Sequence, residues 1–343
     1  MSGDGDMACS NELDSPSVTV IIVAYNSGVY LQFCLEALAA QTFSDFEVVI
    51  ADNDSDDGAI AALRLPDARF RVRDMGSNLG FAAANNRVAE DSKADFLVLL
   101  NADTLAEPGW LEALVIAGRA HPEAASFGSI QIRMDDRDIF DGVGDVWHVA
   151  GIAWRALQGL PRCPISDAEI MGPCAAGALY RRDDFLEIGG FDERFFCYCE
   201  DIDLALRLQL AGRSSRRVAG AVLLHAGSGT TGRISEFTLY HGHRNRVWTF
   251  LKNTPGVWFW IFLPYHLAAN FWLLWRCRSE SEVSRILRRA YVDAWRGREP
   301  FLGERRAASR AGYSRLLPLL AMTPWSVSRR LDISRGSGLS LKE

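Results

Sequence analysis

The sequence lacks the marks of several large classes of protein. Residues 1–16 are acidic and rich in small residues, without the apolar core of a signal peptide, so we expect neither a signal nor a transit peptide but a short flexible tail. The seven cysteines show no paired metal spacing, which favours reduced thiols over a zinc site. There is no internal repeat, no G-x-x-x-x-G-K-[ST] and no strand-linked G-x-G-x-x-G. A nucleotide, if bound, is held by another device.

The composition is that of a globular protein with an uneven charge. Hydrophobic residues make up 48% of the 343 residues and charged residues 23%, enough for one large domain or two moderate ones. The net charge is −6, but residues 276–343 carry 15 basic against 7 acidic residues, or +8, which leaves −14 for residues 1–275. We expect no nucleic-acid partner.

An apolar belt, "VWFWIFLPYHLAANFWLLW", occupies residues 257–275 and contains no Asp, Glu, Lys or Arg. Its 19 residues approach the roughly 20 that a membrane span needs, but Pro264, His266 and Asn270 disfavour a span. Aromatic residues followed by arginines suit a helix lying in a membrane interface. A core or dimer-interface helix explains the belt equally well, and the sequence leaves both interpretations open.

Three apolar, β-branched runs predict buried strands, at residues 17–26, 46–54 and 94–103. A helix is expected at about 29–40, and the weaker "RFRVRD" segment is compatible with another strand. This alternation predicts an α/β fold with a doubly wound, mostly parallel sheet, in which sites lie at the carboxyl ends of the strands. The segment 127–172 lacks a regular pattern, so we expect loops and short strands that cover the sheet edge.

Each strong strand ends in polar residues, which should lie side by side at one edge of the sheet. These are Asn26, then Asp52, Asn53 and Asp54, then Asn101 and Asp103. Asn101 and Asp103 are two apart, so both can face one hard cation such as Mg²⁺ or Mn²⁺. Turn formation is an equally good explanation of an isolated N-x-D.

Three acids precede a leucine-rich helix in "FFCYCEDIDLALRLQLAG", residues 195–212. Asp203 has Arg207 four residues on, which predicts an ordinary surface ion pair. Asp201 lies toward the apolar side of the helix without a local cation, so it is the stronger functional candidate.

Six segments in order resemble the family 2 glycosyltransferases of GT-A fold, specifically a bacterial branch with rhamnosyltransferase-like members. They are "VTVIIVAYN", "ADNDSDDG", "SNLGFAAANN", "LLNADT", "GALYRRDDFLEIGGFDERFFCYCEDIDLALRLQLAG" and "LLHAGSGT". The resemblance covers residues 17–250. It implies a tail at 1–16, a GT-A domain at 17–250 and a helical, basic extension at 251–343 that is a candidate for membrane association.

The resemblance also implies roles for particular residues. The nucleotide-sugar donor would contact Ala24, Tyr25, Asp52, Asn78, Gly80, Phe81, Asn85 and Asn101. Asp103 and His225 would hold Mg²⁺ or Mn²⁺, although Asn101 stands where many relatives have a second Asp. Asp201 would be the general base, and Glu200 would bind the acceptor or support the base.

The activity implied is inverting transfer of a sugar, with rhamnose the first choice, from a nucleotide-diphosphate donor to a saccharide acceptor in cell-surface polysaccharide synthesis. UDP sugars remain open as donors. The apolar belt and basic tail are compatible with a polyprenyl-diphosphate-linked acceptor and with a cytoplasmic enzyme peripheral to the inner face of the plasma membrane. A sugar-nucleotide nucleotidyltransferase should carry a G-x-G-x-R loop after the first strand, where this chain has "VAYNSGVY", and a non-catalytic binding protein should have lost the acids.

Overall fold

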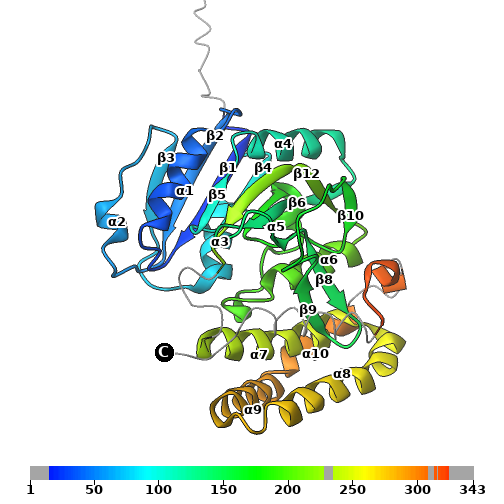
Figure 1. The fold of residues 1–343 in the computed structure, drawn as a ribbon. Helices are drawn as coiled ribbons and strands as arrows, with labels where there is room; N and C mark the ends of the chain where they lie inside the picture. Colours follow the sequence, from blue (N-terminus) through cyan, green and yellow to red (C-terminus); the bar gives the residue numbers. More distant parts are fainter. Residues whose placement is uncertain (1–14, 228–234, 308–312, 315, 324–343) are drawn as a thin grey trace, which may run out of the picture.

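A large mixed sheet forms the centre of the computed structural model, which describes residues 15–227, 235–307, 313–314 and 316–323 (Figure 1). Its main path is β10 (Ala168–Ile170), β12 (Ser214–His225), β6 (Ala124–Arg133), β11 (Gly177–Arg181), β4 (Phe96–Leu100), β1 (Val18–Ala24), β2 (Phe46–Asp52) and β3 (Phe70–Asp74). β5 (Thr104–Ala106) pairs with β12, and β7 (Phe140–Gly142) pairs with β6. A separate hairpin joins β8 (Asp145–His148) to β9 (Ile152–Arg155).

The half of the sheet from β4 to β3 is parallel and covered by helices on both faces. Alternate residues of β1 enter different cores, as a period of two requires. Val20 and Ile22 pack with α1 (Tyr30–Ala39) and α4 (Trp110–Ala120), while Ile21 packs with α3 (Gly80–Asp91) and α6 (Glu200–Leu210). The predicted doubly wound α/β architecture is confirmed.

The segment 127–172 differs from its prediction at its start. Residues 124–133 form β6, a ten-residue strand inside the sheet between β11 and β12, whereas loops and short strands were expected. Nine of its ten residues are buried, so both faces are covered and the period-two alternation that marks a half-buried strand is missing. The rest of the segment holds the short strands β7 to β10, as expected, and the weak "RFRVRD" segment is confirmed as β3.

The remaining helices are short up to residue 195, and the first three that follow α6 are long. They are α2 (Ala59–Ala62), α5 (Arg182–Glu187), η1 (Glu193–Phe195), α7 (Glu236–Asn253), α8 (Gly256–Arg276), α9 (Ser281–Arg296), α10 (Glu299–Ala307) and η2 (Leu317–Leu319). In Figure 1, α7 to α10 form a layer beneath the sheet and beside α6. A second core joins this layer to the domain, in which Phe195 and Ile202 pack with Trp248 and Phe301. The rings of Trp248 and Phe301 stack with centroids 4.8 Å apart.

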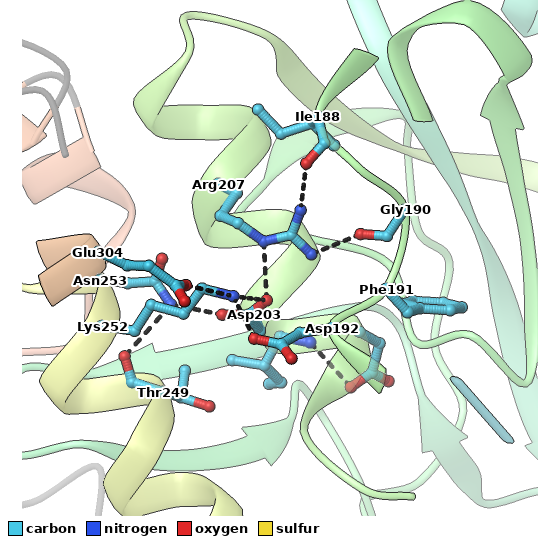
Figure 2. Close-up of polar contacts among 12 residues, drawn as sticks. Ile188, Gly190, Phe191, Asp192, Asp203, Arg207, Thr249, Lys252, Asn253 and Glu304 are labelled. Carbon is cyan, nitrogen blue, oxygen red and sulfur yellow. Dashed lines mark hydrogen bonds and ion pairs between the residues drawn. The ribbon is translucent and has the colours of Figure 1, made fainter. Parts of the chain in front are cut away.

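A buried ionic network centred on Asp203 links α6 to α7 (Figure 2). Its carboxylate accepts hydrogen bonds from Arg207 Nε at 2.7 Å, Lys252 Nζ at 3.0 Å and Asn253 Nδ2 at 2.8 Å. Lys252 also donates to Asp192 at 2.7 Å. The predicted pairing with Arg207 is present, but the prediction of a surface ion pair is wrong, because Asp203 is 0% exposed. Sequence spacing could not show that α7 covers this helix face.

The charges around Asp203 determine how it contributes to stability. Burial alone would raise the pKa of its carboxyl, but Arg207 and Lys252 outweigh burial and hold the pKa below its usual value. The stabilisation is therefore complete above the pKa of aspartate in the unfolded chain, and it is lost as the pH falls through the lowered folded pKa.

We expect Asp203→Asn to lower the free energy of unfolding by about 3 kcal/mol at neutral pH, because it removes one partner of a buried charge network. The control is Asp183→Asn, whose side chain is 97% exposed beside Arg182 and should cost less than about 1 kcal/mol. Urea unfolding of both variants measures the difference. Equal midpoints would contradict the network's role.

Candidate active site

The polar ends of β2, β1 and β4 lie next to one another, as the sequence predicts. β1 pairs in parallel with both neighbours, with Ala24 opposite Asp52 and Ile21 opposite Leu99. The backbone N–H of Asn53 donates to Ala24 O at 2.8 Å, which holds the two strand ends together. Ala24 is buried, while Tyr25, just beyond it, is exposed. At this edge of the sheet the backbone of the strand ends therefore lies beside the exposed ring of Tyr25.

Asn53, which was not among the predicted site residues, fastens the following glycine-containing segment to this edge. Its Nδ2 donates to Asn78 Oδ1 at 2.9 Å, and its Oδ1 accepts from the N–H of Leu79 at 2.9 Å. Gly80 has φ +82°, and a Cβ there would lie 2.5 Å from the ring of Phe196. Glycine is thus required at position 80 both by its backbone conformation and by the close approach of the chain before α6.

Two predicted donor contacts, Phe81 and Asn85, have partners within the protein. Asn85 is buried and its Nδ2 donates to Phe81 O at 2.9 Å, one turn earlier in α3. The Phe81 ring packs against Phe191, with centroids 5.9 Å apart. These contacts hold the helix that follows the segment predicted to bind the donor.

Asp103 and His225 are brought together by the pairing of β5 with β12. In that ladder Thr104 lies opposite His225, and Ala226 N donates to Asp103 O at 3.0 Å. His225 Nε2 consequently lies 3.3 Å from Asp103 Oδ1. The two residues named as metal ligands are thus neighbours, although they are 122 positions apart in the chain.

Asp141 completes this cluster from the other side of the imidazole. His225 Nδ1 lies 2.7 Å from Asp141 Oδ2, and Arg155 is paired with the same carboxylate. Burial alone would lower the pKa of His225, but hydrogen bonds to Asp103 and Asp141 outweigh it and raise the pKa. The carboxylate of Asp141 on Nδ1 orients the imidazole and directs Nε2 toward Asp103.

The side chains of Asp103 and His225 are ligand types that suit a divalent cation with further ligands from phosphate or water. Within residues 15–227, 235–307, 313–314 and 316–323, no group of three or more His, Cys, Asp and Glu side chains is arranged to hold a metal by itself. Asp103 and His225 supply one oxygen and one nitrogen, and both are buried. Mg²⁺ and Mn²⁺ sites commonly use one or two protein ligands and complete the shell with phosphate oxygens and water.

A second cluster joins Glu200 and Asp201, at the start of α6, to Asp145 of β8. Asp201 Oδ2 accepts from the N–H of Ala175 at 3.3 Å, and Oδ1 accepts from the N–H of Ile202 at 2.8 Å. Glu200 Oε2 and Asp145 Oδ2 are buried and have no hydrogen-bond partner in the described part of the chain. A buried oxygen without a hydrogen-bond partner costs free energy, so these two oxygens are candidates for binding a ligand or carrying a proton.

Burial controls the protonation of these three acids. Burial raises the pKa of Asp201, although two backbone N–H donors and the charge of Arg155 oppose the rise. The pKa values of Glu200 and Asp145 are raised well above their usual range by burial and by the neighbouring charge of Asp201. Burial thus favours protonated forms within the cluster, and Asp201 is the member whose carboxylate receives two backbone hydrogen bonds, an arrangement suited to proton transfer.

The base candidate lies close to the N-x-D loop. Asp201 is hydrogen-bonded to Ala175 N, and Ala176 O, the next peptide along, accepts from Asn101 N at 3.1 Å. Asn101 itself directs its N–H into the sheet and its C=O to Thr104 Oγ1 at 2.7 Å. One short backbone segment therefore separates the acid cluster from the end of β4.

Three functional candidates were missed because they lie in the irregular segment 127–172. Asp141, Asp145 and Arg155 come from β7, β8 and β9. Arg155 is paired with Asp141 and also acts electrostatically on Asp145 and Asp201, so it connects the two clusters. The only available signal was the acidic "DGVGD" within a stretch expected to cover the sheet edge.

Comparison with known proteins agrees with this geometry. The family model described as Glycosyl transferase family 2 matches residues 19–189. An N-acetylglucosaminyl-diphospho-decaprenol L-rhamnosyltransferase of Mycobacterium tuberculosis is 30% identical over 298 residues, which cover 79% of this chain and 94% of that protein.

Two solved structures share the fold at low identity. A GalNAc transferase with UDP, GalNAc and Mn²⁺ superposes with a TM-score of 0.56 at 14% identity, over 70% of this chain and 48% of that one. A mannosyltransferase of Pyrobaculum calidifontis, in complex with GDP-Man and Mn²⁺, gives 0.53 at 17% identity over 89% and 79% of the two chains. The fold is that of the GT-A glycosyltransferases, and with the mycobacterial relative matched over nearly its whole length, the chain belongs to glycosyl transferase family 2.

Proposed function

We propose that this enzyme transfers L-rhamnose, with inversion, from a nucleotide-diphosphate donor to an N-acetylglucosaminyl-diphospho-polyprenol acceptor at the cytoplasmic face of the membrane. The carrying observation is the match over 94% of a rhamnosyltransferase whose name gives that acceptor, together with an acid cluster beside the N-x-D loop. Deoxythymidine-diphosphate rhamnose is the donor to test first. Purified enzyme should form the disaccharide from this donor, and transfer from UDP sugars at an equal rate would overturn the choice of rhamnose.

The donor would bind across the ends of β2, β1 and β4. Ala24 and Asp52 would contact the nucleoside, with Tyr25 exposed beside it. Asn78 and Gly80 would lie near the sugar, in the segment that Asn53 holds. These assignments rest on matching positions in the family pattern and on the adjacency of the segments.

Asp103 and His225 would hold Mg²⁺ or Mn²⁺, and Asp141 would fix the ring of His225. Two structures of the same fold were solved with Mn²⁺, which supports a divalent cation here. The bound cation would offset the negative charge that develops on the leaving diphosphate. Asn101 would contact the donor through an amide, where many relatives have a second Asp.

Asp201 would act as the general base. It accepts the proton of the acceptor hydroxyl while that oxygen bonds to the anomeric carbon, and the bond from this carbon to the diphosphate breaks on the opposite face. Its two backbone hydrogen bonds fix the carboxylate at the start of a buried helix, which defines the line of attack. Burial raises the pKa of Glu200, and in its protonated form this side chain would donate a hydrogen bond to the acceptor.

We expect Asp201→Asn to lower the rate of transfer by about 10²–10⁴-fold, because the amide cannot accept the proton. Donor affinity should remain, since the substitution preserves size and leaves the β-strand ends untouched. Radiolabelled sugar transfer and donor titration measure the two quantities separately.

Two variants calibrate this result. Asp183→Asn, an exposed aspartate on α5, should be fully active, and Glu200→Gln should lose less than Asp201→Asn. Normal turnover by Asp201→Asn would place the base elsewhere.

We expect Asp103→Ala to abolish the part of donor affinity that depends on Mn²⁺, because it removes the carboxylate of the proposed ligand pair. Asp141→Asn should weaken Mn²⁺ binding by about 10–100-fold, as loss of an orienting carboxylate does. Calorimetric titration with Mn²⁺ and nucleoside diphosphate, without turnover, gives both values. Unchanged Mn²⁺ dependence in Asp103→Ala would refute the ligand assignment.

The acid side of the pH–rate profile should report Asp201. Burial raises its pKa, and the base works only when ionised, so kcat/KM should fall on acidification at a higher pH than the roughly 3.9 of an exposed aspartate would give. Donor affinity measured over the same range separates this loss from loss of the cation site. An acid limb at the ordinary aspartate value would contradict the buried-base mechanism.

A further inference from the structure

Helix α8 exposes a continuous face of large apolar side chains. Trp260 and Phe271 are 68% and 71% exposed, which is far from the burial expected of such residues in a core helix. The other exposed members of this face are Val257, Ile261, Tyr265, Leu267, Trp272 and Trp275. They fall within one side of the helix at 100° per residue, and α8 contains no acidic residue.

The opposite face of α8 faces the protein and holds its polar residues beside the buried Phe259 and Phe262. His266 Nδ1 lies 2.9 Å from Ala150 O, and Asn270 Nδ2 lies 2.9 Å from His266 Nε2. Arg246 of α7 donates to Asn270 Oδ1. The His266 ring stacks on Phe250 with centroids 4.0 Å apart. Burial and the charge of Arg246 lower the pKa of His266 to about 3, so this anchor is a neutral imidazole.

This orientation separates the three explanations of the apolar belt. A core helix would bury most of its aromatic residues, but here only Phe259 and Phe262 are buried, beside His266, while the larger aromatic set is exposed. Of the described helices, α8 alone is long and apolar enough to cross a membrane. A span would nevertheless have to break the hydrogen bonds of His266 and Asn270 and carry both groups into hydrocarbon, which is costly. A helix lying flat in a lipid interface keeps these bonds and buries the aromatic face.

Arginines lie over exposed tryptophan rings near the end of α8 and near the end of α9. The guanidinium of Arg278 lies 4.3 Å from the ring of Trp275, and that of Arg298 lies 3.9 Å from the ring of Trp295. Trp295, on α9, is 65% exposed. In Figure 1, α8 and α9 lie on the side of the molecule away from the sheet. Tryptophan with arginine beside it is the pair that suits lipid headgroups.

The uneven charge of the chain indicates which side of the molecule would face an anionic surface. Among the described residues, 276–307 carry nine basic against five acidic residues, or +4, and 15–227 carry 18 basic against 31 acidic residues, or −13. An anionic surface therefore attracts the α8–α9 side and repels the rest of the domain. A second copy of this chain would bring two such basic segments together, which like charge disfavours.

We propose that α8 lies in the plane of an anionic lipid bilayer, with its exposed aromatic face among the acyl chains and Arg276, Arg278 and Arg298 at the phosphate headgroups. Only the role of this binding rests on the proposed function: it would bring the active site to a polyprenyl-linked acceptor. The binding itself is independent of catalysis.

Co-sedimentation of the full chain with vesicles tests the surface. We expect binding to phosphatidylglycerol/phosphatidylcholine vesicles, weaker binding to phosphatidylcholine alone, and weakening by added salt. Trp260→Ser with Phe271→Ser should reduce binding by about tenfold or more, because two large apolar side chains no longer leave water. Ile116→Ser is the matched control, since Ile116 is 61% exposed on α4 and should leave binding unchanged.

Each remaining outcome is decisive. Equal vesicle binding by the double variant and the Ile116→Ser control would overturn the proposal. So would loss of a dimer by the double variant in sedimentation velocity without loss of lipid binding, which would make the face a contact between copies. Resistance of the bound protein to alkaline carbonate extraction would show a spanning helix instead. The melting temperature of each variant checks that it is folded. If the unsubstituted protein fails to transfer sugar to a short, water-soluble acceptor, that result counts against the proposed activity but not against this lipid-binding surface.

Discussion

The hold of Asn245 on the segment before α6 is the contact on which the acid cluster depends. Phe196, Tyr198 and Cys199 have φ values of 66°, 71° and 66°, a region that residues with a side chain seldom occupy. Such backbone persists only when its surroundings compensate the strain. Asn245 Nδ2 donates to the carbonyl oxygens of Phe195, Cys197 and Tyr198 at 2.8–2.9 Å. This one buried amide of α7 thereby fixes where α6 begins and where Glu200 and Asp201 lie.

The C-terminal helices consequently help to position the candidate active site. α7 holds the strained segment through Asn245 and holds α6 itself through Lys252 and Asn253, which bind Asp203. The same helix carries Arg246, which anchors α8. One helix therefore connects the proposed catalytic base to the proposed lipid surface. It begins before and ends after residue 250, where the sequence pattern of the family stops.

Two features offset the negative charge around the proposed donor site. A diphosphate arriving beside Asp103, Asp141 and Asp201 would be repelled if all the acids were ionised and uncompensated. Arg155 supplies one fixed positive charge between the two clusters, and a divalent cation on Asp103 and His225 would supply more. The other device is protonation, because burial favours the neutral forms of Asp145 and Glu200. Removing charge by burial requires no further cation in a crowded site.

The sequence alone determined the parallel half of the sheet and the adjacency of its polar strand ends. Apolar runs ended by Asn and Asp are local signals, and parallel strands order their carboxyl ends at one edge whatever the rest of the chain does. The family pattern then named Asp103, His225 and Asp201, and the structure brings the first two within 3.3 Å of each other. Other features needed the fold. Asp203 was predicted at the surface but is 0% exposed, because α7 packs over it. Asp141, Asp145 and Arg155 come together from short strands that show no sequence periodicity. The orientation of the 257–275 helix was also undecided in sequence, since its composition is the same whichever face turns inward. In the structure His266 bonds to Ala150, and Asn270 bonds to Arg246. Phe259 and Phe262 join the second core on the same side, so the larger aromatic set faces outward.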